Sequence, residues 1–445
     1  MKKVATLSIV IIVFAVIYFF YAQPSFKIAT GYGAKYLGSY TFLSNLPDTI
    51  VKKDLNFSIV KYANYEFNES ERSMEAKLFG LVAQEAQYHT SGIASGCYLD
   101  QDDQDDAPPT GSLKTTHEYT NYDHYWPQGD KLQDTIFSNV NTRKLKEIIE
   151  RTIDSFPYTR AISIAYKNHL IAENYAPGVN INSRLLGWSM TKTISGTLIG
   201  NLEKNGLIKR NDPAGFIQWQ KDDRNQITVN NLLQMCSGLK WTEDYTKISE
   251  VTRMLYLEPD FASYAISRPQ NYAAGDFWYY ASGTTNILSQ IIRSKFNSQK
   301  DYLSFPKDSL FNIIGMNSAL IETDNSGNFV FSSYGWATAR DWTRFGLLYL
   351  NKGNWFGHQV FTPEWFKYST TPAPASDGQY GVQLWLNASK KQLPSAPADA
   401  FFEKGYGGQR VVIIPSMDLV VVLLSGRQQG FDFDTFLSEV LDCFE

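Results

Sequence analysis

Cysteine and histidine are scarce in this chain of 445 residues, which has three cysteines (Cys97, Cys236 and Cys443) and five histidines. The cysteines are far apart and odd in number, which excludes a disulfide framework and a cysteine-rich zinc or iron–sulfur site. No two histidines form an H-x-x-x-H pair. The sequence therefore predicts no metal ion and no cofactor, and at most one disulfide bond within the chain.

An excess of positive charge is also lacking, because 41 basic residues face 45 acidic ones and the formal net charge is −4. A protein without a basic field has little attraction for a polyanion, so we expect no nucleic-acid partner. Charged residues make up only 19% of the chain, whereas aromatic residues reach 15%. This composition is opposite to that of a disordered chain and predicts a folded protein with a large core.

The N-terminus carries a long apolar run, from Val4 to Ala22, directly after Lys2 and Lys3. As a helix, these 19 residues would span roughly 28 Å, about the thickness of the hydrocarbon core of a membrane. A cleaved signal peptide has a shorter apolar region and small residues before the cut, where this chain has Phe20. We therefore expect a single-pass membrane anchor rather than a cleaved signal peptide. The lysines would be cytoplasmic and the body of the protein extracytoplasmic, on the periplasmic side.

Three regions follow from the composition: a transmembrane anchor at 1–22, an accessory N-terminal region at 23–130 and a main domain at 131–445. The accessory region contains the acidic run Asp100–Gly111. This run lacks the D-x-D-x-D-G-x₅-E frame of a calcium loop, so a solvated surface loop is the better interpretation.

The main domain has strand patterns at both of its ends. The expected elements are a helix at Leu145–Phe156, a β-hairpin at Ala161–Tyr175 with its turn at Lys167 and Asn168, buried strands at Gln409–Pro415 and Leu419–Ser425, and a helix at Phe433–Phe444. The sequence between them is mostly helical. We therefore expect one sheet that brings the C-terminal strands beside the early hairpin, with a helical subdomain inserted in the middle.

The tetrapeptide Ser189-Met190-Thr191-Lys192 opens the apolar helix Ile194–Leu202. A serine at a helix start and a lysine three residues later lie on one face, beside the amide donors and the positive end of the helix dipole. This arrangement supplies a nucleophile, an amine that takes its proton and half of an oxyanion hole. An ordinary serine that caps the helix would give the same local pattern.

The S-x-x-K pattern is weak by itself, since it is expected roughly twice by chance in a chain of this length. A second copy occurs at Ser304-Phe305-Pro306-Lys307. Because Pro306 prevents continuation from an existing helix and no amphipathic helix begins at Ser304, we interpret this copy as a turn.

Two further segments give Ser189 its context. Tyr280-Ala281-Ser282-Gly283 precedes an apolar helix, and Gly405-Tyr406-Gly407-Gly408 stands at the entrance of a buried strand. Together the three segments resemble the catalytic elements of the serine β-lactamase and penicillin-binding-protein superfamily, especially the branch of class C β-lactamases, family VIII-type esterases and 6-aminohexanoate-dimer hydrolases. The resemblance runs from Lys131 to Gly426. Its further matching segments are Ile227–Tyr245, Tyr334–Gly353 and Tyr380–Asn387.

The resemblance implies an α/β fold of the β-lactamase/transpeptidase type, an α+β sandwich with an antiparallel sheet flanked by helices and an inserted helical subdomain. It also implies that Ser189 is the acylated nucleophile and Lys192 its base. Tyr280 would exchange protons with Lys192 and with the leaving group. Ser282 stands where many relatives have asparagine, and it either forms a hydrogen bond near Lys192 or is an ordinary turn serine.

The third element departs from the β-lactamase pattern, because Lys-Thr-Gly is replaced by Lys404-Gly405-Tyr406-Gly407. On the resemblance, the N–H groups of Ser189 and Tyr406 form the oxyanion hole, and Gly405 and Gly407 help to shape it. Lys404 either anchors a substrate carboxylate or is a solvated lysine at the strand edge. Loss of the hydroxyl residue argues against antibiotic hydrolysis more than against ester or amide hydrolysis.

These features predict a membrane-anchored serine hydrolase that cleaves a small amide or ester through an acyl-enzyme. The alternative is a catalytically silent, penicillin-binding-like protein that binds cell-wall peptides. The presence of Ser189, Lys192 and Tyr280 together favours the enzyme, because a binding protein has no need for all three. The chain has no G-x-S-x-G motif, which argues against an α/β-hydrolase.

Overall fold

The computed structural model describes residues 22–44, 46–90, 95–100, 124–428 and 430–445. The expected anchor, apart from Ala22, and all of the acidic run after Asp100 lie outside these described residues. Among the helices of the described ranges, none is both long and apolar enough to cross a membrane.

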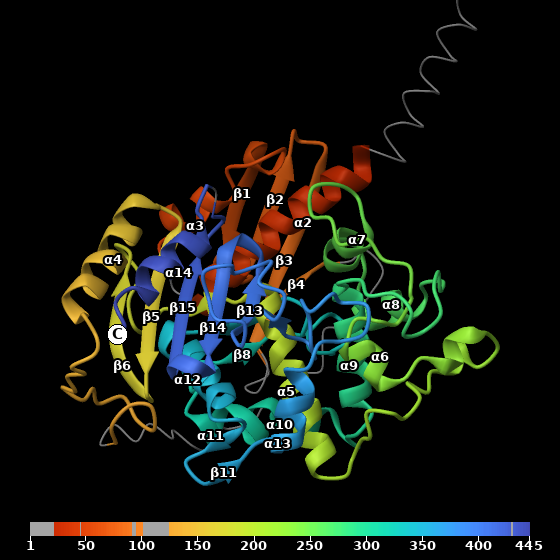
Figure 1. The fold of residues 1–445 in the computed structure, drawn as a ribbon. Coiled ribbons are helices and arrows are strands. Elements are labelled where there is room, and N and C mark those ends of the chain that lie inside the picture. Colours follow the sequence, from red (N-terminus) through yellow and green to blue (C-terminus); the bar gives the residue numbers. More distant parts are fainter. Residues whose placement is uncertain (1–21, 45, 91–94, 101–123, 429) are drawn as a thin grey trace, which may run out of the picture.

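A six-stranded antiparallel sheet forms the centre of the main domain (Figure 1). In spatial order its strands are β12 (Trp385–Leu386), β13 (Phe401–Gly405), β14 (Gln409–Ile414), β15 (Leu419–Ser425), β5 (Thr159–Tyr166) and β6 (His169–Tyr175). Because β15 pairs with β5, the C-terminal strands lie beside the early hairpin, as the sequence predicts. The hairpin turns at Lys167 and Asn168, whose φ angles of 48° and 62° suit a tight two-residue turn.

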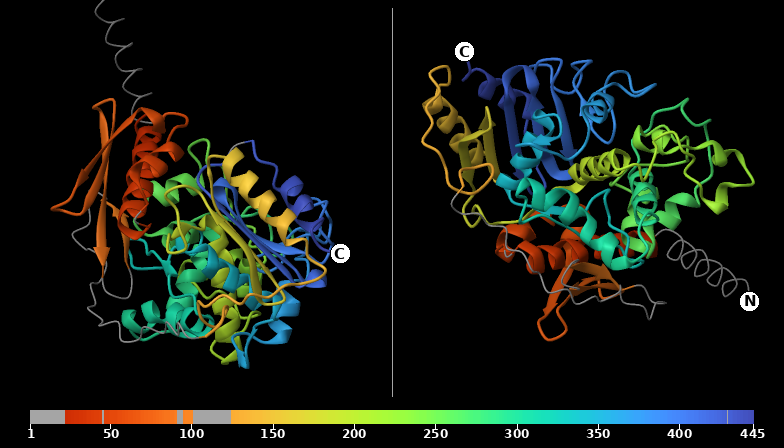
Figure 2. Two further views of the ribbon diagram at one scale, coloured as in Figure 1. Left: turned by 90° about the vertical axis from the view of Figure 1, so that its left-hand side faces the viewer. Right: turned by 90° about the horizontal axis from the view of Figure 1, so that it is seen from below.

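Helices cover both faces of this sheet. Alternate side chains of β15 are buried in two different cores, as Val420 and Val421 illustrate. The core around Val420 is shared with α12 (Ala339–Leu350). The core around Val421 is shared with α4 (Thr142–Ser155) and α14 (Phe433–Leu441), which form the outer layer (Figure 2). Both helices predicted from the sequence at the ends of the main domain are therefore confirmed.

A largely helical region connects β6 to β12. It contains α5 (Thr191–Lys204), α6 (Val229–Leu233), α7 (Glu250–Leu257), α8 (Phe261–Ile266), α9 (Ser282–Arg293), α10 (Gln299–Pro306), α11 (Asn312–Ile314), α12 and α13 (Pro363–Ser369), together with the short strands β7 (Leu185–Leu186), β8 (Leu320–Ile321), β9 (Gly335–Ala337), β10 (Asn354–Trp355) and β11 (His358–Gln359). The expected helical subdomain is thus present.

The second S-x-x-K copy lies in a helix, so the prediction of a turn was wrong. Ser304 is inside α10, which begins after Ser298, and the Ser298 side chain accepts from the backbone N–H of Asp301 at 3.1 Å. Pro306 is the last residue of α10, and the chain continues directly into a π-helical turn at Lys307–Phe311. A proline at this end leaves the earlier hydrogen bonds of the helix in place.

The accessory region packs against the main domain as a further layer. It consists of α2 (Gln23–Ser39), α3 (Asp48–Asp54) and an antiparallel sheet of β1 (Ala63–Asn68), β2 (Ser73–Leu78), β3 (Val82–Thr90) and β4 (Ser95–Leu99). Helix α2 lies between this small sheet and the main domain (Figure 2). The packing is close, since a Cβ at Gly31 would stand 2.4 Å from the Gln84 side chain on β3 and 3.3 Å from Tyr256 on α7.

Buried ion pairs join the accessory region to the main domain. Lys35 on α2 donates to Glu322 Oε1 at 2.7 Å, and the two side chains are 7% and 0% exposed. Asp54 at the end of α3 pairs with Arg160 on β5, and both side chains are buried. Charges this deep are stable only when they are paired, so each region neutralises the buried charges of the other.

Candidate active site

Ser189 lies in a short 3-10 turn, Trp188–Met190, that runs directly into α5. The turn is tightly constrained: Trp188 has a φ of 49°, and a Cβ at Gly187 would stand 2.3 Å from the Trp342 ring. The Trp188 ring is buried against Tyr32 of α2 and Tyr406. A strained residue held by packing on both sides fixes the position of the next residue, Ser189.

Lys192 is the first charged residue of α5, and its side chain is fully buried. Its Nζ lies 3.0 Å from Ser189 Oγ, 3.0 Å from Ser282 Oγ and 2.9 Å from the carbonyl oxygen of Ser332. Burial lowers the pKa of Lys192 from 10.5 to about 8, an effect that the charge of Glu243 partly opposes. About a tenth of Lys192 is therefore a neutral amine at pH 7, and the fraction rises as the pH approaches 8.

Glu243 determines how the hydrogens of Lys192 are arranged. Its carboxylate accepts from the Ser282 backbone N–H at 2.9 Å and also from the Ser282 hydroxyl. Because Ser282 gives its proton to Glu243, its oxygen can only accept from Lys192. The Ser332 carbonyl is likewise only an acceptor. A neutral Lys192 therefore donates its two hydrogens to Ser282 Oγ and to the Ser332 carbonyl oxygen. Its lone pair then faces Ser189 Oγ.

Sequence reasoning missed Glu243. It lies in the matching segment Ile227–Tyr245, but its partner Ser282 is 39 residues further along the chain. The Trp241 Nε1–H donates to Glu243 Oε2 at 2.6 Å, and the Tyr245 hydroxyl donates to Oε1 at 3.4 Å. An acidic residue between two aromatic residues was the available signal, and it does not by itself indicate a partner.

The ring of Tyr280 packs over Lys192, with the ring centroid 4.8 Å from Nζ. The rings of Trp385 and Tyr380 hold it in place, with centroids 5.2 Å and 5.9 Å away. Burial and the charge of Glu243 raise the pKa of the Tyr280 hydroxyl, and the neighbouring Ser189 side chain opposes this shift. Tyr280 is therefore protonated over the physiological pH range and able to donate a proton.

The glycine-rich element adjoins the nucleophile turn. Gly405 ends β13, and a Cβ there would stand 2.2 Å from the carbonyl oxygen of Gly187. Tyr406 follows directly, so its backbone lies beside the turn that carries Ser189. Gly407 has a φ of 78°, and a Cβ would stand 2.5 Å from the Gly426 carbonyl oxygen. Both glycines are thus needed for close backbone packing at this corner.

Lys404 is half-buried on β13, which does not fit a solvated lysine at the strand edge. Its Nζ donates to Gln392 Oε1 at 3.1 Å and lies 5.3 Å from the centroid of the Trp385 ring. Burial and the neighbouring Arg410 lower its pKa to about 8. One aromatic ring, Trp385, separates Lys404 from Tyr280. Within the described part of the chain, no group of three or more His, Cys, Asp or Glu side chains is arranged to hold a metal ion.

The antiparallel sheet, the inserted helices and the serine–lysine pair define a β-lactamase/transpeptidase-like α/β fold. The beta-lactamase family model matches residues 157–440, well over half of the chain. The protein therefore belongs to the beta-lactamase family and is a β-lactamase-related serine hydrolase. The resemblance inferred from the sequence is confirmed.

Solved structures with the same fold include three of different named activities. A Bacillus anthracis protein assigned as a 6-aminohexanoate-dimer hydrolase has a TM-score of 0.58 and 20% identity, covering 70% of this chain and 85% of its own. A family VIII carboxylesterase has a TM-score of 0.54 and 13% identity, covering 71% and 100%. A class C β-lactamase has a TM-score of 0.52 and 12% identity, covering 70% and 99%. At these identities the likeness establishes the fold.

Proposed function

We propose that the protein hydrolyses a small amide or ester through an acyl-enzyme on Ser189. Neutral Lys192 takes the Ser189 proton while Oγ attacks the carbonyl carbon of the substrate. The oxyanion forms beside the backbone N–H groups of Ser189 and Tyr406. Tyr280 passes a proton to the leaving group, and the acyl-enzyme is then hydrolysed by water.

The observation that carries this proposal is the environment of Lys192. Its amine is buried, its pKa is lowered to about 8, and its Nζ lies 3.0 Å from Ser189 Oγ. Both of its hydrogens in the neutral form have acceptors other than Ser189. A lysine whose only purpose was structural would gain nothing from a lone pair directed at a serine hydroxyl, so this arrangement supports general-base catalysis rather than a silent binding protein.

We further propose that 4–22 is an uncleaved membrane anchor and that the hydrolase faces the extracytoplasmic side. The long apolar run and the two preceding lysines support this orientation. An intact N-terminus on membrane-bound protein, with the body open to external protease, is the expected result. A mature N-terminus at or beyond Gln23 would instead indicate a cleaved signal peptide.

The decisive experiment is to label the protein with a fluorophosphonate or penicillin probe and to map the modified residue by peptide mass spectrometry. We expect the label on Ser189 and none in Ser189→Ala. The matched control is Ser304→Ala, which removes the second S-x-x-K serine and should retain full labelling. Labelling that persists in Ser189→Ala, or that maps to Ser304, would overturn the proposal.

A further inference from the structure

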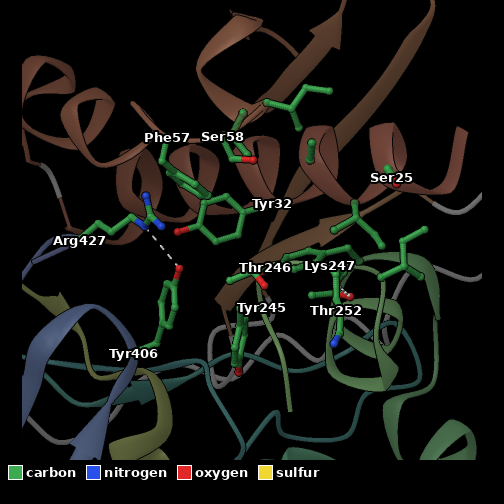
Figure 3. A pocket seen from close by; sticks show the side chains of 16 residues that line it. Ser25, Tyr32, Phe57, Ser58, Tyr245, Thr246, Lys247, Thr252, Tyr406 and Arg427 are labelled. Carbon is green, nitrogen blue, oxygen red and sulfur yellow. Dashed lines mark hydrogen bonds between the residues drawn. The ribbon is translucent and has the colours of Figure 1, made fainter. Parts of the chain in front are cut away.

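A cavity of about 320 Å³ lies where the accessory region meets the main domain (Figure 3). One wall is formed by α2 and the segment after α3, including Ile28, Tyr32 and Phe57. The opposite wall is formed by the main domain, including Tyr245, Tyr406 and Arg427. The family match begins at residue 157, so half of this cavity is built from residues outside the family core.

The charge of this cavity is entirely positive. Its lining contains two cations, Lys247 and Arg427, and no acidic side chain. Lys247 already has a partner, because it pairs with Asp244 at 3.0 Å and is 63% exposed. Arg427 is therefore the cation of the lining whose partner has to be identified.

The Arg427 guanidinium contacts two neutral side chains, those of Tyr406 and Phe57. Its Nε–H donates to the Tyr406 hydroxyl at 3.4 Å, and its Cζ lies 3.6 Å from the centroid of the Phe57 ring. Among the residues that the structure describes, no carboxylate lies within 4.0 Å of it. The nearby Asp54 binds the Arg427 backbone N–H at 3.1 Å and turns its other oxygen to Arg160. A guanidinium has five N–H donors, and with respect to the described side chains all but the Nε–H are available to a ligand.

The cavity adjoins the candidate active site through two tyrosines. The rings of Tyr245 and Tyr406 stack at 4.9 Å between the cavity and the catalytic residues. The Tyr245 hydroxyl donates to Glu243, which in turn binds Ser282. Tyr406 contributes its ring to the cavity, and its backbone lies beside the turn of Ser189. A substrate group held in the cavity would therefore contact the tyrosine pair that joins it to the hydrogen-bond network of Ser282.

We propose that this cavity is a substrate subsite for an apolar chain that ends in a carboxylate, with Arg427 as its anchor. The inference rests on the proposed function, because it names the substrate class of the same hydrolase. The aromatic and aliphatic lining suits the chain, and the planar guanidinium suits a carboxylate. A single available cation balances one negative charge, which favours a carboxylate over a phosphate carrying almost two.

Two esters of equal chain length test the inference: the mono-p-nitrophenyl ester of suberic acid, which carries a free carboxylate, and p-nitrophenyl octanoate, which does not. The readout is the ratio of their kcat/KM values. The intact protein should prefer the suberate ester. Arg427→Met should lower the ratio about ten- to a hundredfold, as expected for the loss of a hydrogen bond to a charged group. Arg427→Lys should retain part of the preference.

The matched control is Lys247→Met, which removes the other cation of the cavity lining. Because Lys247 is exposed and paired with Asp244, the ratio should stay within about twofold of that of the unmodified protein. An intact protein without a preference for the suberate ester, or an Arg427→Met variant that keeps the preference, would overturn the inference.

Fluorophosphonate labelling of Ser189 in every variant separates this outcome from a failure of the proposed function. Ligand-observed NMR can measure the binding of free suberate to the Ser189→Ala variant, and this readout needs no turnover. We expect binding that is lost in the Ser189→Ala/Arg427→Met double variant. If Ser189 is labelled but suberate binds equally well with and without Arg427, the subsite assignment is wrong while the hydrolase assignment stands.

Discussion

The carboxylate of Glu243 accepts both the backbone N–H and the hydroxyl proton of Ser282. This double contact fixes the Ser282 hydroxyl so that its oxygen faces Lys192 as an acceptor at 3.0 Å. The lone pair of a neutral Lys192 is consequently directed at Ser189. Glu243 touches neither Ser189 nor Lys192 in any of these hydrogen bonds, so we regard it as a positioning residue.

Activity should rise with pH through a midpoint near 8. Only neutral Lys192 can accept the Ser189 proton, and burial lowers its pKa from 10.5 to about 8. Below that pH the amine is charged and kcat/KM falls about tenfold per pH unit; above it, kcat/KM reaches a plateau. The raised pKa of Tyr280 keeps the proton donor intact on this plateau. A kcat/KM profile from pH 5 to 10 with a p-nitrophenyl ester measures the midpoint, and a flat profile would contradict this role of Lys192.

Substitution of Glu243 should move this midpoint. The charge of Glu243 raises the pKa of Lys192, so Glu243→Gln should shift the midpoint to lower pH while its amide oxygen still accepts from Ser282. Glu243→Ala removes the acceptor altogether. Ser282 is then able to donate to the lone pair of Lys192 in competition with Ser189, and kcat/KM should fall about tenfold or more.

The two Glu243 variants distinguish positioning from a purely structural role. A structural role would lower the melting temperature and the amount of active enzyme but leave the midpoint of the pH profile unchanged. Circular dichroism on both variants provides the control for folding. An unchanged midpoint in Glu243→Gln would show that the carboxylate does not act on Lys192.

Substitutions of Lys192 and of Tyr280 should differ in how strongly they reduce the cleavage of amides and of esters. Lys192→Ala should abolish acylation by both substrates, because it removes the amine that lies 3.0 Å from Ser189 Oγ and takes its proton. Tyr280→Phe should reduce amide cleavage by about 10²–10⁴-fold, the usual contribution of a general acid, and affect an activated p-nitrophenyl ester far less. An amine leaving group needs the proton, whereas p-nitrophenolate does not. Equal losses on a matched amide and ester pair would exclude Tyr280 as the acid.

The ion pair between the accessory region and the main domain should be important for stability. Glu322 accepts from Lys35 at 2.7 Å and from the Cys97 N–H at 2.9 Å, in a fully buried position. Glu322→Gln leaves the Lys35 charge buried and unpaired, which should lower the free energy of unfolding by about 3–5 kcal/mol. Chemical denaturation measures the change.

Glu147→Gln is the matched control, because Glu147 pairs with Arg143 on the exposed face of α4 and its loss should be hardly measurable. Adding Lys35→Met to Glu322→Gln should recover part of the lost stability by removing the unpaired charge. A Glu322→Gln variant as stable as the control would show that this pair contributes little to the joint between the two regions.

Local patterns in the sequence were sufficient for much of the fold and part of the site. The spacing of Ser189 and Lys192 is a property of one helical turn, and the strands at Leu419–Ser425 and in the early hairpin follow from their own side-chain patterns. The link between Glu243 and Ser282 depends on how a loop folds back over the start of α9, and no periodicity encodes that. The left-handed conformation of Trp188 is likewise imposed by packing around a residue type that rarely adopts it.

The position of α2 between the small sheet and the main domain has a consequence for protein production. A fragment that begins at Lys131, the boundary suggested by composition, would leave Glu322 and Arg160 without their partners and would remove one wall of the cavity beside Arg427. A shortened protein designed around the family core is thus expected to fold poorly. An expression boundary placed before α2 keeps both buried ion pairs and both walls of this cavity in the same polypeptide.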